Sequence, residues 1–352
     1  MMISERAKRL TPYVAGEQPK DKKYIKLNTN ENPYPPSNDV SRAIRNFDFS
    51  RLKLYPDPDA SLLKKEIAAF EGVEEENVFV GNGSDEVLSF AFYALFDGNV
   101  VFPDITYSFY PVYCDYYGIS YSRIPLRDDF TVNVGDYIGK KTGGIAIANP
   151  NAPTSIALDN KSIETIIREN EKKCNVLVDE AYVDFAHTCT SAVPLTKKYS
   201  NLLVVKTFSK SYSLAGMRVG YAVGNKKLIG ALNATKNSFN SYPVDCLAQA
   251  AAIAAIKDRD YFEHSCEMVI STRGSMATRL SAHDFTVLPS DTNFLFVAPP
   301  EGITAQELYG KLRENGILVR YWNAPRIENY LRITVGTDDE AEALIDAINR
   351  IL

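Results

Sequence analysis

Short apolar stretches alternate with helical ones from about residue 77 to residue 209, and this alternation constrains the fold more than any other feature. The apolar stretches are rich in β-branched and aromatic residues, which favours strands. Strands that alternate with helices form a mostly parallel sheet covered on both faces, so we expect an α/β fold. The expected strands include NVFVG (77–81), VVFP (100–103), GIAIANP (144–150), NVLVDEAY (175–182) and NLLVVKTFS (201–209).

Polar clusters occur at the carboxyl ends of four of these strands. They are GNGSDE (81–86), NPNAPTS (149–155), DEAY (179–182) and TFSKS (207–211). Ligands of open parallel sheets bind at the carboxyl ends of the strands. We therefore expect the four clusters to converge on a single crevice.

The chain has 352 residues, more than one hydrophobic core usually supports, so we expect a large and a smaller domain. Residues 1–30 are expected to form an N-terminal helix and arm, and residues 31–240 a large cofactor-binding domain. The composition changes after residue 240, where residues 241–352 predict a smaller α+β domain with an antiparallel sheet. In the large domain we expect a helix with Ser61 as its cap and Gly72 as its stop.

Composition and charge exclude several classes of protein. The formal net charge is -5 and no basic block is present, which argues against a nucleic-acid-binding surface. The start, MMISERAKRLTPY, lacks the apolar core of a signal peptide, and no apolar stretch is long enough to span a bilayer. The five cysteines are widely spaced and form no metal-type cluster. We expect a cytoplasmic protein without a metal site and with reduced cysteines.

The stretch TFSKSYSLAGMR (207–218) places Lys210 between two serines after an apolar strand, with Arg218 eight residues later. One amine, several hydroxyls and one guanidinium suit an aldehyde and a phosphate. Pyridoxal 5'-phosphate carries both groups and forms a Schiff base with a lysine amine. Lys210 is therefore our candidate for that lysine, although most lysines near strand ends are solvated surface charges.

Three other side chains suit the ring of this cofactor. Asp179, at the end of a strand, can keep the ring nitrogen protonated, although an acid there equally suits a helix cap. Tyr182 can hydrogen-bond the 3-oxygen of the ring, and a packed tyrosine is the alternative. Tyr107, in PDITYSFYP, can stack on the flat heterocycle.

The phosphate requires hydrogen-bond donors, and GNGSDE offers backbone N–H groups at the start of a helix. Gly83, Ser84 and Asp85 are the expected cradle. Ser209 adds a hydroxyl, and Arg218 adds a planar fork of donors that matches phosphate oxygens.

The motifs together resemble the fold type I aminotransferases that depend on pyridoxal phosphate, and among them the histidinol-phosphate aminotransferase family. The resemblance covers nearly the whole chain and implies a large cofactor-binding domain and a smaller α+β domain. It also implies a homodimer with its active site at the subunit interface. The motifs are LTPY (10–13), LNTNENPYPPS (27–37), YPDPD (55–59), GNGSDE, PDITYSFYP (103–111), NPNAPTS, DEAYVDF (179–185), TFSKSYSLAGMRVGY (207–221) and YLRITVGT (330–337).

The resemblance also implies the reaction and the site residues. The family passes an amino group between L-histidinol phosphate and 2-oxoglutarate, giving imidazole acetol phosphate and glutamate, in histidine biosynthesis. The implied catalytic residues are Lys210, Asp179 and Tyr182, and Tyr55 is expected to reach the phosphate of the neighbouring subunit. The implied cofactor contacts are Tyr55, Gly83, Ser84, Asp85, Tyr107, Asn151, Asp179, Tyr182, Thr207, Ser209, Lys210 and Arg218. The implied substrate contacts are Tyr13, Asn32, Arg320 and Arg332.

Two points concern the ring and the substrate. The family often has N-N-P-T-G where this chain has NAPTS, so the usual ring-contacting asparagine aligns with Ala152, and we expect Asn151 to substitute for it. Arg320 and Arg332 are expected to form an anion site for a carboxylate in one half-reaction and a phosphate in the other. A surface arginine paired with an acid is the alternative for Arg320.

We expect Lys210, once released, to move a proton between the substrate carbon and the cofactor as general base and acid. The nearest alternatives are an aromatic amino acid aminotransferase or a threonine-phosphate decarboxylase of the same fold. A regulatory module that binds pyridoxal phosphate without catalysis is disfavoured, because such modules typically carry a DNA-binding extension and this chain has no basic domain. A nicotinamide-dependent oxidoreductase is disfavoured because Glu86 occupies the third glycine position of G-x-G-x-x-G.

Overall fold

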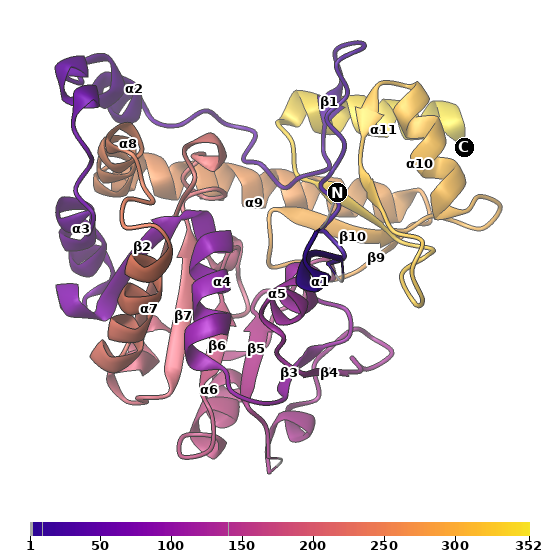
Figure 1. Cartoon of the computed structure of the whole chain (residues 1–352). Helices are drawn as coiled ribbons and strands as arrows, with labels where there is room; N and C mark the ends of the chain where they lie inside the picture. Colours follow the sequence, from indigo (N-terminus) through magenta and orange to yellow (C-terminus); the bar gives the residue numbers. More distant parts are fainter. Residues whose placement is uncertain (1–2, 9, 140) are drawn as a thin grey trace.

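A seven-stranded sheet forms the centre of the larger part of the computed structural model, which describes residues 3–8, 10–139 and 141–352 (Figure 1). This sheet and the helices packed on it are called the large body below. The strands, in spatial order, are β2 (Val78–Asn82), β8 (Val219–Gly224), β7 (Leu202–Thr207), β6 (Val176–Asp179), β5 (Gly144–Ala148), β3 (Val100–Pro103) and β4 (Tyr121–Ile124).

Strand β8 runs against both of its neighbours, and the other adjacent strands pair in parallel. Because β8 is antiparallel to β2 and to β7, these two strands point the same way as β5 and β6. The carboxyl ends of β2, β5, β6 and β7 therefore lie along one edge of the sheet. The expected mostly parallel α/β fold is confirmed.

Both faces of this sheet are buried. Phe79 lies in the core on one face with α4 (Gly83–Leu95), α5 (Phe109–Tyr117) and α7 (Lys226–Phe239). Its neighbour Val80 lies in the core on the other face, where residues of the remaining helices pack. Side chains alternate between the faces of a strand, so apolar residues at successive positions require cover on both sides. The helices on that second face are α3 (Ser61–Glu71), α6 (Asn160–Glu169) and α8 (Cys246–Lys257).

The expected cap of α3 is wrong, although its expected stop is confirmed. Ser61 is the first helical residue, and Ala60 occupies the cap position without a side-chain hydrogen bond. The carboxylate of Asp57 takes the capping part instead, because it accepts from the backbone N–H of Ser61 at 2.8 Å and from that of Asp59 at 3.0 Å. Gly72 ends the helix with φ +67°, in the left-handed region where glycine is favoured.

The C-terminal part forms a second layer, called the small body below. Its four-stranded sheet is antiparallel in the order β12 (Arg320–Tyr321), β13 (Leu331–Thr334), β10 (Phe294–Ala298) and β9 (Thr286–Val287), as expected. The long helix α9 (Arg259–Ala282) connects it to the large body, and α10 (Ala305–Glu314) and α11 (Asp338–Ile351) cover it (Figure 1). The division at residues 30 and 240 stays a proposal, and α8 packs in the core of the large body.

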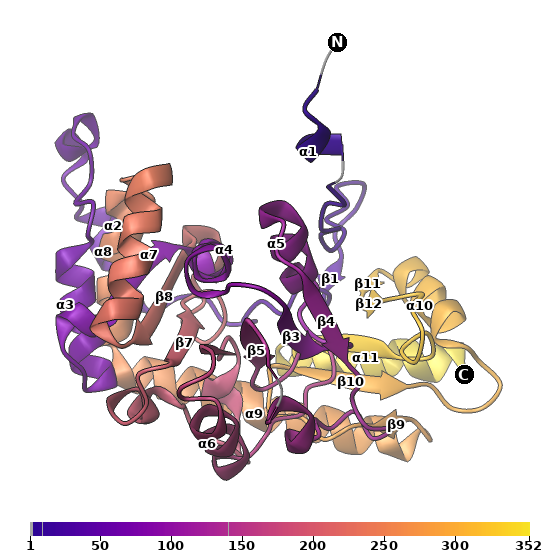
Figure 2. The same ribbon diagram turned by 60° about the horizontal axis from the view of Figure 1, so that its bottom comes forward.

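The N-terminal segment links the two bodies. Strand β1 (Ile25–Lys26) pairs in parallel with β11 (Ile317–Leu318), and Leu27 is buried in the core of the small body. The chain then crosses back to the large body, where α2 (Asn38–Arg45) packs beside α8 (Figure 1). We call residues 28–32, at this crossing, the strap. The short helix α1 (Glu5–Lys8) lies at the N-terminal end of this segment (Figure 2).

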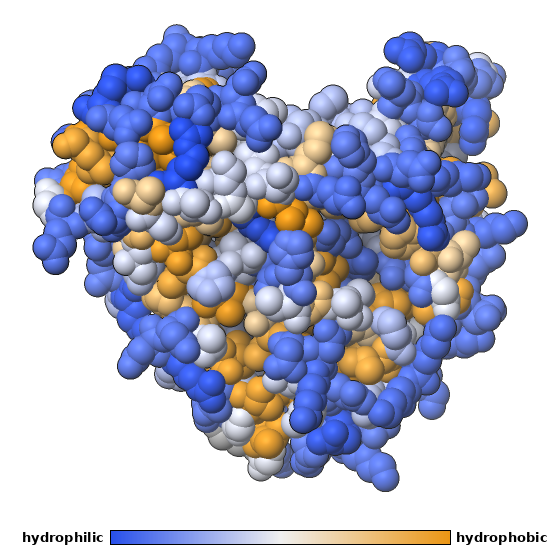
Figure 3. Space-filling view, turned by 180° about the vertical axis from the view of Figure 1, so that it is seen from behind, coloured by the Kyte–Doolittle hydropathy of each residue, from blue (hydrophilic) through white to orange (hydrophobic). Residues whose placement is uncertain are grey.

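The molecular surface is polar over most of the face shown in Figure 3, with scattered apolar residues. Its upper edge is hollowed between the side of α2 and the side of α10 and α11 (Figures 1 and 3). Among the described residues, no helix is long and apolar enough to cross a bilayer.

Candidate active site

One cavity lies where the edge of the large sheet meets the strap and the small body. Residues from all four polar clusters line it, together with Arg218, which immediately precedes β8. Because β8 starts at the edge where its neighbours end, this strand brings an arginine to the same place. The lining residues are Tyr13, Gly16, Asn28, Thr29, Asn30, Ser84, Asp85, Tyr107, Ala148, Pro150, Ala152, Asp179, Ala181, Tyr182, Thr207, Ser209, Lys210, Arg218, Arg320 and Arg332.

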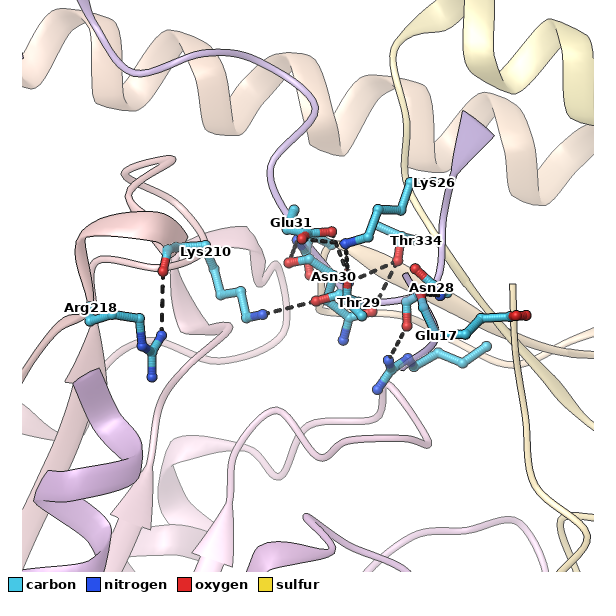
Figure 4. Close-up of polar contacts among 12 residues, drawn as sticks. Glu17, Lys26, Asn28, Thr29, Asn30, Glu31, Lys210, Arg218 and Thr334 are labelled. Atoms are coloured by element: carbon cyan, nitrogen blue, oxygen red, sulfur yellow. Dashed lines mark hydrogen bonds and ion pairs between the residues drawn. The ribbon is translucent and has the colours of Figure 1, made fainter. Parts of the chain in front are cut away.

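Lys210 extends from the loop after β7 toward the strap, and its Nζ donates to the backbone carbonyl of Thr29 at 3.2 Å (Figure 4). The amine lies 5.9 Å from the centre of the Tyr182 ring. Burial, and then the positive charge of Arg332, lowers the pKa of Lys210 to about 8. A lysine with such a pKa is neutral in an appreciable fraction near pH 7, and only the neutral amine is a nucleophile.

Asp179 ends β6 inside the cavity and is buried, with 5% of its surface exposed. The hydroxyl of Tyr110 donates to its Oδ2 at 3.0 Å, and the N–H of Ala181 donates to its Oδ1 at 3.2 Å. Burial nevertheless raises the pKa of Asp179 to about 6. A buried carboxylate without a cationic partner attracts any protonated nitrogen that enters beside it.

Tyr182 lies just after β6, and its ring packs edge-on against Phe294 with the centroids 5.1 Å apart. Its hydroxyl oxygen accepts a hydrogen bond from Nδ2 of Asn30 at 3.0 Å. Burial raises the pKa of Tyr182, while Arg332 and the amide of Asn30 oppose the increase. The phenol is therefore protonated and lines the cavity with its polar end.

A cluster of donors lies at the start of α4. Gly83 begins this helix with φ +76°, so a left-handed backbone turns the chain from β2 into it. Arg218 donates to Oδ2 of Asp85 at 2.8 Å and approaches Oγ of Ser209 at 3.5 Å. The N–H groups of the first turn, including that of Ser84, have no carbonyl partner within the helix. This arrangement is typical of a phosphate site.

Glycines make the close approach in this cluster possible. A Cβ added to Gly83 would meet Nη2 of Arg218 at 2.5 Å, and one added to Gly220 would meet the backbone N of Ser84 at 2.3 Å. Tyr107 also belongs to this side of the cavity, because its hydroxyl donates to Oδ1 of Asp85 at 2.7 Å.

Two arginines of the small body face the same cavity from the opposite side. Arg332 on β13 donates to the carbonyl of Asn28 at 2.9 Å, and its buried Nε has no hydrogen-bond partner. Arg320 on β12 donates to the carbonyls of Val14 and Ala15 at 2.9 and 3.2 Å. Within the described ranges neither guanidinium forms an ion pair, so the alternative of an acid-paired Arg320 finds no support. Burial lowers the pKa of Arg332, because no acidic side chain of the described residues offsets the free energy that burying its charge costs.

Tyr13 and Thr207 line the cavity, whereas four other expected residues do not: Gly83, which only begins α4 beside it, Asn32, Tyr55 and Asn151. The amide of Asn151 is engaged with the carbonyl of Ile105 and the hydroxyls of Thr106 and Thr154. This residue therefore cannot replace the missing ring contact without breaking those bonds, and Ala152 lines the cavity instead.

Asn32 and Tyr55 are also directed elsewhere. Asn32 donates to the carbonyl of Ser211 at 3.4 Å, so its side chain supports the loop that carries Lys210. Tyr55 is 81% exposed and stacks on Tyr242 with the centroids 4.6 Å apart. Such exposure leaves the Tyr55 ring free to contact a second subunit.

The strap contributes three residues that the sequence did not single out: Asn28, Thr29 and Asn30. Asn30 is buried and has φ +56°, a left-handed conformation that asparagine tolerates better than most residues. Thr334 of the small body bonds both its backbone N–H and its Oδ1, at 3.0 and 3.1 Å (Figure 4). The signal available in the sequence was an asparagine two residues before the expected site residue Asn32, in the loop LNTNENPYPPS.

Comparison with known proteins decides the family of the chain. Residues 22–348 match the family model described as aminotransferase class I and II. The chain belongs to this aminotransferase family. A protein named histidinol-phosphate aminotransferase 2, from Dechloromonas aromatica, is 53% identical over 97% of this chain and 96% of its own length. The histidinol-phosphate aminotransferase of Acinetobacter baylyi is 52% identical over 98% of this chain and 96% of its own length.

Solved structures agree with the fold of this aminotransferase. The histidinol-phosphate aminotransferase from Sinorhizobium meliloti, solved in complex with pyridoxal-5'-phosphate, has a TM-score of 0.85. It is 23% identical, and the match covers 94% of this chain and 92% of that chain, so it supports the fold alone. The expected fold type I architecture and the expected membership of the aminotransferases are confirmed.

Proposed function

We propose that this aminotransferase uses pyridoxal 5'-phosphate to exchange an amino group between L-histidinol phosphate and 2-oxoglutarate, giving imidazole acetol phosphate and glutamate. One observation carries the proposal: Lys210, Asp179 and a helix start rich in donors line one cavity, opposite two arginines that form no ion pair with a described residue. Relatives that are about half identical over nearly their whole length carry the name histidinol-phosphate aminotransferase, which supports the choice of substrate.

The residues fit the cofactor on grounds of their own chemistry. The donors at the start of α4, with Ser209 and Arg218, match a phosphate. No cation of the described part of the chain pairs with the carboxylate of Asp179, which binds Tyr110 and the N–H of Ala181. The pyridine ring of the cofactor, when bound, withdraws electrons from the substrate carbon. Tyr182 and Tyr107 also line the cavity.

Lys210 has two tasks in this proposal. Its amine would hold the aldehyde of the cofactor, and the lowered pKa of Lys210 favours the neutral form that this requires. When its amine is free, Nζ of Lys210 would act as general base and acid, taking a proton from the substrate carbon and delivering it to the cofactor. The carbonyl of Thr29, 3.2 Å away, holds the amine at the cavity wall.

Arg320 and Arg332 fit the anionic end of both substrates. A guanidinium presents a planar fork that matches a carboxylate as well as a phosphate. The buried Nε of Arg332 has no hydrogen-bond partner among the described residues, and an anion in the cavity would satisfy it. The second substrate then uses the same site as the first, and because the enzyme keeps the amino group between the two half-reactions we expect ping-pong kinetics.

The test is a spectrum of the purified protein before and after addition of histidinol phosphate, with product assays. We expect a visible absorption band that changes with the substrate and recovers with 2-oxoglutarate. Phenylalanine and threonine phosphate are assayed in parallel, with and without 2-oxoglutarate. Preferred turnover of phenylalanine, or loss of carbon dioxide from threonine phosphate, would replace the proposal with an aromatic aminotransferase or a decarboxylase.

We also propose a homodimer in the cytoplasm, in which Tyr55 reaches the phosphate site of the partner subunit. The exposure of Tyr55 in the single chain supports this arrangement. Mixing Tyr55→Ala with Lys210→Ala subunits tests it, because a mixed dimer contains one site with both native residues. Activity that appears only after mixing and subunit exchange supports the proposal, and unchanged inactivity contradicts it.

A further inference from the structure

The hydrogen bonds of Asn30 fix the orientation of its side-chain amide. The hydroxyl of Thr334 accepts from the backbone N–H of Asn30 at 3.0 Å, so its own proton is available for Oδ1 of Asn30 at 3.1 Å. With Oδ1 directed to Thr334, Nδ2 is directed to the hydroxyl of Tyr182 at 3.0 Å. The backbone carbonyl of Asn30 accepts from Asn293 at 2.9 Å, which holds the residue from a third direction.

This orientation decides what the hydroxyl of Tyr182 can do. A phenol has one proton to donate, and its oxygen can accept. Because the amide of Asn30 donates, the oxygen of Tyr182 is the acceptor, and its proton is not used in that bond. Among the residues that the structure describes, no other hydrogen bond of this hydroxyl is formed. The proton is therefore available to a group in the cavity that Tyr182 and Asn30 both line.

We propose that Asn30 is a positioning residue that keeps the proton of Tyr182 directed at the 3-oxygen of the bound cofactor. The inference rests on the proposed function, since that function places the cofactor beside Tyr182. The same amide ties Tyr182 to β13, because Thr334 and the anion-binding Arg332 lie on that strand. Asn30 thereby connects the small body, which holds the substrate anion, to the electron distribution of the ring.

The consequence is measurable as a shift in the pH titration of the visible band. Without the amide of Asn30, the hydroxyl of Tyr182 can rotate and donate its proton to another acceptor. The 3-oxygen then loses a hydrogen-bond donor and carries more negative charge. A more negative oxygen binds a neighbouring proton more tightly, so the midpoint moves to higher pH. One neutral hydrogen bond corresponds to a shift of about half to one pH unit.

The experiment uses the full-length holoenzyme and the substitution Asn30→Gly, because glycine adopts φ +56° without strain. We expect the midpoint to rise by about half to one unit while the cofactor content stays that of the wild type. The matched control is Asn170→Gly, which removes a buried amide that donates to the carbonyls of Tyr137 and Ile166, outside the cavity lining. The control should leave the midpoint unchanged.

Tyr182→Phe separates a positioning role from a structural one. If Asn30 acts through Tyr182, Asn30→Gly adds no further rise in the Tyr182→Phe background. An unchanged midpoint in Asn30→Gly would overturn the inference. So would a full rise of the midpoint when Asn30→Gly is added to Tyr182→Phe. Asn30→Asp, which keeps the side-chain shape and removes the donor, replaces the glycine variant if that variant does not fold. A wild-type protein without a visible band refutes the proposed function itself, which is a distinguishable result.

Discussion

Replacing Arg332 with methionine should separate catalysis from stability. Nε of Arg332 has no partner and its pKa is lowered by burial, so the protein bears a cost for this cation. We expect loss of two charge-assisted hydrogen bonds to each substrate anion, worth about 1.5 to 3 kcal/mol each. The sum, about 3 to 6 kcal/mol, lowers kcat/KM by about 10²- to 10⁴-fold for both histidinol phosphate and 2-oxoglutarate.

The free energy of unfolding should change far less, by under about 2 kcal/mol, because methionine keeps the packing and the charge no longer requires burial. The substitution removes a hydrogen bond to the carbonyl of Asn28. It also removes the cation–π contacts of the guanidinium with the rings of Phe294 and Trp322, whose centroids lie 5.3 and 5.2 Å away. Steady-state kinetics and urea unfolding of the same preparations measure both quantities. Arg279→Met is the control, because Arg279 pairs with Glu342 on the surface and should leave kinetics unchanged. Normal kinetics in Arg332→Met, or a collapse of stability, would refute this reasoning.

Three further predictions concern the cofactor side. Lys210→Ala should abolish transamination and remove the visible band of the purified protein, and full activity in this variant would contradict the assignment. Burial raises the pKa of Asp179 from 3.8 to about 6. Between about pH 4 and 6 the folded, cofactor-free protein therefore keeps a proton on Asp179 that the unfolded chain has lost, and the free energy of unfolding falls as the pH rises. In urea unfolding across this pH range, the free energy of unfolding of Asp179→Asn should lack this decrease of about 3 kcal/mol. The same decrease in the variant as in the wild type would show that other groups cause it. Gly220→Ala should destabilise the protein by about 1 to 3 kcal/mol, because the added Cβ meets the backbone of Ser84. Gly230→Ala lies at an open helical position and should stabilise the protein by up to about 1 kcal/mol. Equal unfolding midpoints for the two glycine variants would contradict the steric argument.

The sequence predicted the large sheet because its strands are short, apolar and bounded by polar clusters. It left out β8 and its reversal, since an apolar run such as residues 219–224 does not indicate the direction in which a strand pairs. What reverses the chain is the loop after Lys210, where Ser213 and Arg218 both have positive φ. Their conformation depends on packing that a local pattern does not contain.

The site was predictable where a residue lies at the carboxyl end of its strand or shortly after it, as Asp179 and Lys210 do. The direction of a side chain within a loop was not. Asn151 and Asn32 carry amides of the right kind, but neighbouring carbonyls and hydroxyls already bind them. Asn30 acquires its place from Thr334, 304 residues away, a contact that no spacing rule predicts.

The pairing of β1 with β11 joins residues near the two ends of the chain. During synthesis the large body is complete long before Ile317 and Leu318 leave the ribosome, so Ile25 and Lys26 wait unpaired for their neighbours. The hydrogen bond from the amine of Lys210 to the carbonyl of Thr29 on the strap forms only after β1 has paired with β11. A nascent or truncated polypeptide that ends before β11 can thus fold its central layer and still lack a finished cofactor pocket.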